Sequence, residues 1–170
     1  MPAFLSNAAV ALFCLAAVTD LHRRIIPNWI TGALLLLFAL AALADPVRYP
    51  TVPSLVAAVV VFVPLLAVFA TGRLGGGDVK LLTAAALWAG WDQLGELLVV
   101  VGLAGGGLAV AYVIRHLPRS PAQLALWLPV GLSSPRRLLP EAVAEAGLPY
   151  GVAIAAGAAF VLQPDGNWGF

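Results

Sequence analysis

The sequence has few of the residues that soluble or metal-binding proteins depend on. Only 10% of its 170 residues are charged, against about 25% in ordinary soluble domains. A single cysteine excludes a disulfide within the chain and a zinc site built from several cysteines. The two histidines, His22 and His116, lack the spacing of metal ligands, and no glycine-rich loop precedes Lys-Ser or Lys-Thr as in nucleotide-binding proteins. We therefore expect no metal ion, no cofactor and no nucleic-acid partner.

Long apolar segments make up most of the chain instead. Hydrophobic residues account for 62% of it, and the mean hydropathy is +0.98. A helix needs about 20 apolar residues to cross a bilayer. The candidate spans are Phe4 to Thr19, Trp29 to Ala44, Val52 to Thr71, Val79 to Trp91, Leu94 to Ile114 and Leu148 to Leu162. The sequence thus predicts an all-α polytopic membrane protein with about six transmembrane helices, in a single domain over residues 1–170.

The basic residues predict how these helices cross the membrane. Eight of the nine lie in the odd-numbered connections or beside them, and only Arg48 lies in an even-numbered one. Because lysine and arginine concentrate on the cytoplasmic side, the odd connections should face the cytoplasm and both termini the outside. The long connection 115–147 is then a cytoplasmic or interfacial loop.

Two aspartates lie where apolar segments meet this predicted cytoplasmic side. Asp20 follows the first span and Asp78 precedes the fourth, so the topology delivers both to one face. Carboxylates that meet in a low-dielectric setting share a proton, and such a pair supplies a general base and a general acid. The alternatives are that Asp20 balances neighbouring arginines and that Asp78 is a helix N-cap. Lys80 either extends to the interface or tunes Asp78.

Three short motifs, taken together, resemble the type IV prepilin peptidase family, which are membrane aspartic proteases of the Gly-x-Gly-Asp class. The first runs from Asp20 through a basic stretch to Ile-Pro-Asn, ending at Asn28, and the second from Gly75 to Leu81. A third, less discriminating match opens the last span at Leu148. The resemblance implies that Asp20 and Asp78 are the catalytic pair. It further implies that these residues line or support the substrate cleft: Pro27, Asn28, Gly75, Gly77, Lys80, Pro149, Tyr150 and Gly151.

The resemblance also implies a function. Members cleave the leader of prepilin precursors at the cytoplasmic face of the bacterial inner membrane, so the expected partners are pilin-like precursors and the lipid bilayer. Larger members carry paired Cys-x-x-Cys motifs and methylate the mature pilin. This chain lacks those motifs, so we expect peptidase activity alone, as in the short forms that serve tight-adherence pili.

Other functions remain open on the sequence alone. The pair could act on another precursor, such as a preflagellin, or on membrane segments in the manner of presenilin. A small proton-coupled or cation-coupled transporter and a non-enzymatic scaffold are the alternatives outside proteolysis. No oligomeric state is predicted.

Overall fold

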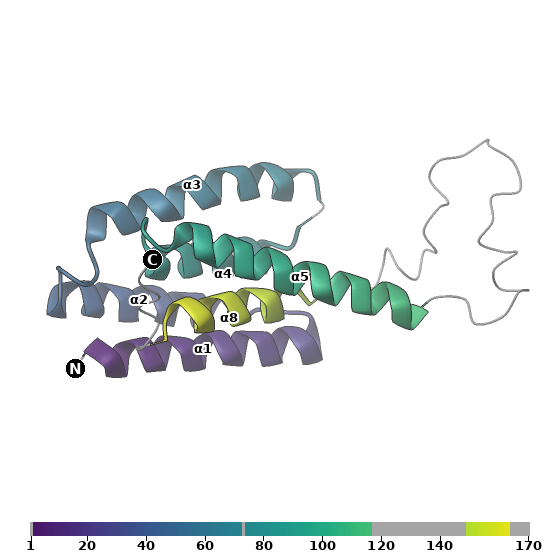
Figure 1. Ribbon diagram of the computed structural model, residues 1–170, viewed down its shortest axis with the longest axis horizontal. Helices are drawn as coiled ribbons and strands as arrows, with labels where there is room; N and C mark the ends of the chain where they lie inside the picture. Colours follow the sequence, from purple (N-terminus) through teal and green to yellow (C-terminus); the bar gives the residue numbers. More distant parts are fainter. Residues whose placement is uncertain (1, 73, 117–148, 164–170) are drawn as a thin grey trace, which may run out of the picture. The chain divides into compact units, whose positions relative to one another are not determined.

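A computed structural model of the chain describes residues 2–72, 74–116 and 149–163. This part is built from helices, with no strand in it. The helices are α1 (Pro2–Arg23), α2 (Asn28–Ala44), α3 (Thr51–Ala70), α4 (Gly76–Ala89), α5 (Leu94–His116) and α8 (Tyr150–Val161), as Figure 1 shows. Each predicted span corresponds to one helix, so the all-α prediction is confirmed. The predicted loop 115–147 lies almost wholly outside the described residues.

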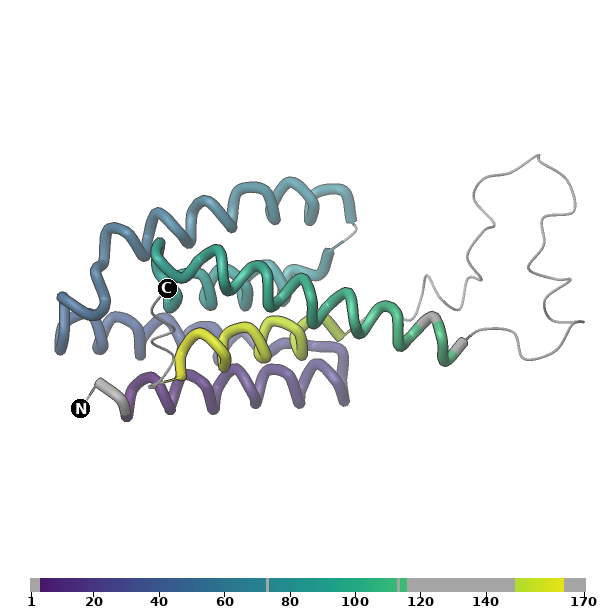
Figure 2. The backbone as a smooth tube through the Cα atoms, viewed as in Figure 1, coloured from purple at the N-terminus to yellow at the C-terminus, as the bar shows by residue number. Residues whose placement is uncertain are grey.

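One compact unit contains the features that concern function. It comprises residues 1–105 and 149–170, and residues 106–148 form a second unit. Within the first unit, consecutive helices run in alternating directions, as the tube in Figure 2 traces. α8 packs extensively against α1 and runs antiparallel to it. The C-terminal end of α1 therefore lies at the same end of the bundle as the start of α8.

Membrane-spanning character is clear for three helices by length and composition. α1, α3 and α5 each contain an apolar stretch of 19 or 20 residues, and α2 and α8 are shorter apolar helices. Much of the surface of α3 is apolar and exposed, for example at Val52 and Val63. A helix that exposes such residues is suited to lipid rather than water. These features agree with a polytopic membrane protein.

α4 is the shortest of the first five helices and occupies the interior. It packs against α2, α3 and α8, and every residue from Ala84 to Ala89 is buried. Its 14 residues would span only about 21 Å, less than the roughly 30 Å hydrocarbon core. Because neighbouring helices rather than lipid enclose it, α4 does not need the length of a lipid-facing span.

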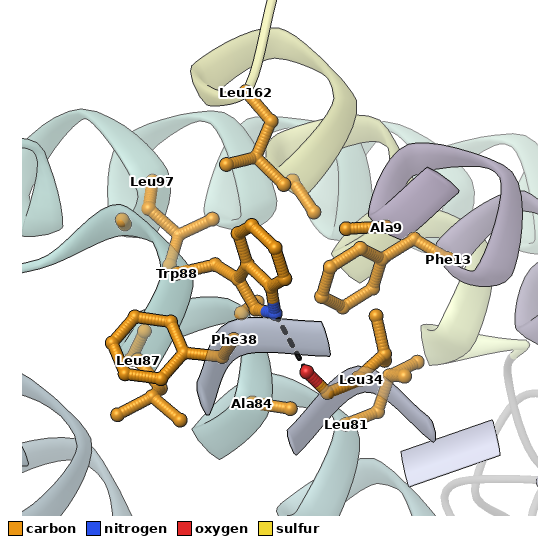
Figure 3. Packing of buried hydrophobic residues seen from close by; sticks show 14 of the residues in the cluster. Ala9, Phe13, Leu34, Phe38, Leu81, Ala84, Leu87, Trp88, Leu97 and Leu162 are labelled. Carbon is orange, nitrogen blue, oxygen red and sulfur yellow. Dashed lines mark hydrogen bonds between the residues drawn. The ribbon is translucent and has the colours of Figure 1, made fainter. Parts of the chain in front are cut away.

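An aromatic cluster attaches the far end of α4 to its neighbours (Figure 3). The indole Nε1 of Trp88 donates a hydrogen bond of 3.1 Å to the carbonyl oxygen of Leu34 on α2. The rings of Phe38 and Tyr49 each meet Trp88 edge-to-face at a centroid distance of 5.7 Å. Such pairs favour one packing arrangement over others. The cluster thereby fixes the register of α4, and with it the position of Asp78 at the other end.

Candidate active site

Asp20 lies inside the last turn of α1. The helix runs on to Arg23, four residues beyond the predicted end of the span at Thr19. Arg24 ends it, with a left-handed φ of 54° and a backbone hydrogen bond of 2.9 Å from its N–H to the carbonyl of Asp20. A left-handed backbone is uncommon for a residue with a side chain, and here it turns the chain away from the helix axis. The side chain of Asp20 is only 7% exposed.

Asp78 is the third residue of α4. The cap residue is Gly75, and no side chain caps the helix, so the interpretation of Asp78 as an N-cap is wrong. Asp78 is half-buried and precedes the apolar segment that begins at Val79. Burial and, to a lesser degree, the negative charge of Asp20 raise the pKa of Asp78 to about 6. The charge of Asp20 therefore reaches Asp78, which is consistent with the predicted placement of both aspartates at one face.

The third motif contributes a direct contact with Asp20. The backbone N–H of Gly151, in the first turn of α8, donates a hydrogen bond of 2.9 Å to Oδ2 of Asp20. A Cβ atom at position 151 would lie 2.8 Å from that same oxygen. Only glycine therefore fits here without moving the carboxylate. Pro149 is the cap residue of α8, and Tyr150, the first residue of the helix, is 40% exposed.

The two aspartate motifs also touch each other. A Cβ atom on Gly77 would lie 3.1 Å from Cβ of Ile26, so the Ile-Pro-Asn segment packs against the glycine-rich segment. Nearby, Nζ of Lys80 donates a hydrogen bond of 2.9 Å to Oδ1 of Asn28. Its bond to Asn28 gives Lys80 a role in joining the motifs, whereas burial and Asp20 account for the pKa of Asp78.

The remaining residues of these motifs have positional roles. Pro27 is the cap residue of α2 and has an extended backbone, which starts that helix directly after the loop. A Cβ atom on Gly75 would lie 3.0 Å from Oδ2 of Asp78, so glycine leaves room for the carboxylate. Sequence reasoning missed Ile26, which is 9% exposed. Its place in the Ile-Pro-Asn motif was the available signal.

Replacing Gly77 with valine should destabilise the protein, because the added side chain overlaps Ile26. Overpacking of this kind costs about 1–3 kcal/mol in the free energy of unfolding. Thermal unfolding in detergent measures the effect. The matched control is Gly32→Val, since a Cβ atom on Gly32 meets nothing within 4 Å. Equal losses of stability in the two variants would show that the contact between the motifs is not tight.

A separate cavity lies away from the aspartates. It has a volume of about 430 Å³ and is lined by residues that include Ser6, Tyr49, Trp88 and Asp92. Ser6 is on the same helix as Asp20, and the separation of 14 residues corresponds to about 21 Å along the axis. This cavity therefore does not open on the carboxylate pair.

Comparisons with known proteins identify a family and two partially matching relatives. A family model described as "Type IV leader peptidase family" matches residues 8–110, a range that contains both aspartates. A prepilin leader peptidase/N-methyltransferase from Pectobacterium carotovorum subsp. carotovorum is 39% identical over 69 residues, covering 37% of this chain and 24% of the relative. One from Escherichia coli (strain K12), with the same printed name, is 37% identical over 59 residues, covering 34% and 26%. The matches thus span about a quarter of each relative. No solved structure matches the chain.

Proposed function

This chain belongs to the type IV leader peptidase family, and on that premise we propose that it is a membrane aspartic endopeptidase that removes the leader from prepilin-like precursors. The observation that carries the proposal is the joining of the three motifs. The charge of Asp20 acts on Asp78, Ile26 in the loop after Asp20 packs on Gly77 before Asp78, and the N–H of Gly151 donates to Asp20. A pair of carboxylates held this way is suited to acid–base catalysis on a peptide bond.

The chemistry follows from a pair that holds one proton between its members. The ionised carboxylate takes a proton from a water molecule, whose oxygen attacks the carbonyl carbon of the scissile bond. The other carboxyl gives its proton to the carbonyl oxygen, which forms a neutral tetrahedral intermediate. When this intermediate collapses, the carboxyl that took the water's proton gives it to the amide nitrogen, and a hydroxyl group of the intermediate returns a proton to the other carboxylate. The C–N bond breaks, leaving a new carboxyl end and a new amine. The two carboxyl groups and one water molecule are enough to balance the reaction.

The proposed location is the cytoplasmic face of the bacterial inner membrane, with both termini outside. Arg23 and Arg24 directly follow Asp20, and Lys80 follows Asp78 by two residues. The pair thus lies at the end of the bundle that carries positive charge, which the distribution of lysine and arginine assigns to the cytoplasm. A precursor with a cytoplasmic leader and an apolar helix would present its cleavage site at this depth.

Methyl transfer is not part of the proposal. The relatives' printed names include an N-methyltransferase, but the matched segments cover only about a quarter of each relative. This chain has a single cysteine and so lacks the paired cysteine motifs of the larger family members. We propose peptidase activity alone.

The test is cleavage of a purified prepilin-type precursor by the purified protein in lipid nanodiscs, followed by mass spectrometry across a range of pH. We expect one cut between leader and mature segment and a bell-shaped dependence on pH. At low pH both carboxyls are protonated and no base is present, whereas at high pH both are ionised and no acid remains. Because the pKa of Asp78 is raised to about 6, the alkaline decline should lie well above the ordinary aspartate value of about 3.9.

Two outcomes would count against the proposal. An intact precursor at every pH, with folded protein in the nanodiscs, would favour the transporter or scaffold alternative. A cleavage rate that keeps rising with pH would exclude a carboxyl as the acid. Addition of a methyl donor should leave the mass of the mature product unchanged, and an increase by one methyl group would contradict the restriction to peptidase activity.

A further inference from the structure

The two carboxylates differ in what holds them. Asp20 accepts the backbone N–H of Gly151 at 2.9 Å and is buried, with 7% exposure. Asp78 is half-buried. Among the residues that the structure describes, no group donates a hydrogen bond to its carboxylate. The pair is therefore not symmetric, although both members are aspartates.

The contact from Gly151 favours the charged form of Asp20. An N–H that donates to a carboxylate stabilises the anion more than the neutral acid. Gly151 is the second residue of α8, and the first N–H groups of a helix have no partner within the helix. The N–H of Gly151 is therefore free to serve as the donor to Asp20.

The other charged groups around Asp20 reinforce this difference. Burial disfavours the charged form of Asp20, while the N–H of Gly151 and the positive charge of Arg24, just beyond α1, both favour it. Asp78 on α4 is the negative neighbour. Of the remaining packed helices, α2 and α8 contain no charged residue, and the only ordinary titratable group on α8 is the phenol of Tyr150. Lys80 on α4 directs its ammonium group to Asn28.

We propose that Gly151 is a positioning residue whose N–H keeps Asp20 as the ionised member of the pair, so that Asp20 is the general base and Asp78 carries the proton. This inference rests on the proposed peptidase function and adds the division of roles to it. In the first step, Asp20 takes the proton of the attacking water and Asp78 gives its proton to the carbonyl oxygen. When the C–N bond breaks, Asp20 passes its proton to the leaving nitrogen and a hydroxyl group of the intermediate returns a proton to Asp78, which leaves the new carboxyl group and restores both members of the pair.

The absence of a side chain at position 151 is what allows this contact. A Cβ atom there would lie 2.8 Å from Oδ2 and 2.9 Å from Cβ of Asp20. Alanine would therefore keep the N–H but push the carboxylate off its donor. Gly151→Ala is for this reason a specific way to weaken the hydrogen bond while both carboxyls remain.

The pH dependence of cleavage by Gly151→Ala tests the division of roles. If Asp20 is the first carboxyl of the pair to ionise, the weakened hydrogen bond makes that first ionisation harder. The midpoint of the acidic limb should then move up by about one pH unit, a tenfold change in the apparent ionisation constant. The alkaline limb reports the second ionisation, that of Asp78. It should stay in place, because Asp20 is ionised both before and after Asp78 loses its proton. Movement of the alkaline limb alone would overturn the proposal and give Asp78 the role of base.

Two glycine variants separate this effect from ordinary packing damage. Gly157→Ala introduces a clash elsewhere on α8, since its Cβ atom would lie 2.5 Å from Cγ2 of Val101. Gly102→Ala adds a methyl group where nothing lies within 4 Å. We expect the first to lower stability, the second to change little, and neither to move a limb of the pH profile. A rate loss in Gly151→Ala with both limbs in place would show a structural role only and refute the proposal.

An infrared titration provides a readout that needs no cleavage. Asp78→Asn leaves Asp20 as the only carboxyl of the pair, and Asp20→Asn leaves Asp78. The carbonyl stretch of the protonated site carboxyl should disappear at lower pH in Asp78→Asn than in Asp20→Asn. The reverse order, or equal midpoints, would refute the assignment even if Gly151→Ala fails to fold. Because no substrate is present, this result is independent of whether the precursor is cleaved at all.

Discussion

Cleavage of a prepilin-type precursor should fall by about 10²- to 10⁴-fold when either Asp20 or Asp78 is replaced with asparagine. Asparagine keeps the size and polarity of the side chain, but it can neither accept nor release the proton that the reaction moves. The two carboxylates are coupled through their charges, so each depends on the other for its protonation state.

The double variant gives the sharper test. Groups that act as one catalytic unit are strongly non-additive, because the loss of one removes most of what the other contributes. We therefore expect Asp20→Asn combined with Asp78→Asn to be no slower than the slower single variant. Two independent roles would instead multiply the two losses.

Asp92→Asn is the matched control for these variants. Asp92 is exposed and lines the cavity at the other end of the bundle, so this change removes an acidic group without touching the pair. Single-turnover cleavage, with the amount of folded protein measured in parallel, gives the rates. Near-normal cleavage by either Asp20→Asn or Asp78→Asn would exclude the aspartic mechanism.

Gly157→Leu should strongly destabilise the helical bundle. A Cβ atom on Gly157 would lie 2.5 Å from Cγ2 of Val101 and 3.4 Å from the backbone oxygen of Leu97. The backbone of α5 cannot yield as a side chain can, so the larger residue must push α8 away. The expected cost is about 3 kcal/mol in the free energy of unfolding. Catalysis should fall as well, because α8 supplies the amide that holds Asp20.

A smaller change allows a rescue. Gly157→Ala should lower the unfolding temperature in detergent, and adding Val101→Ala should restore much of it by removing the methyl group that clashes. Gly102→Leu is the control, since position 102 is exposed and open. If Gly157→Leu unfolds at the temperature of the Gly102→Leu variant, the close approach of α5 and α8 contributes little to stability.

The helices were predictable because each is an apolar segment bounded by turn-forming residues. The ends of Asn28–Ala44 and Thr51–Ala70 differ from those of the predicted spans by at most one residue. The end of α1 was not predictable in this way, because hydropathy falls at Asp20 while backbone hydrogen bonding continues to Arg23. Hydropathy reports contact with lipid, whereas the helix ends where Arg24 changes its backbone conformation.

The site was predictable only as a set of positions. The motifs identified Asp20, Asp78 and Gly151, and the topology put the aspartates at one end of the bundle. The contact of Gly151 with Asp20 spans 131 positions in the sequence, and no local pattern encodes which atom an amide will meet. The partner of Lys80 was missed for the same reason, since Asn28 is 52 positions away. Such contacts depend on how whole helices pack, which periodicity does not report.

The long separation between Asp20 and its donor has a consequence for biogenesis. Asp20 is synthesised 131 residues before Gly151, the residue whose amide binds it. By the time Gly151 is made, α1 to α5 have already been synthesised. Until α8 arrives, a nascent chain holds its first carboxylate without the N–H that completes its surroundings. The site of a newly made chain is therefore complete only after α8 has been made and has packed against α1.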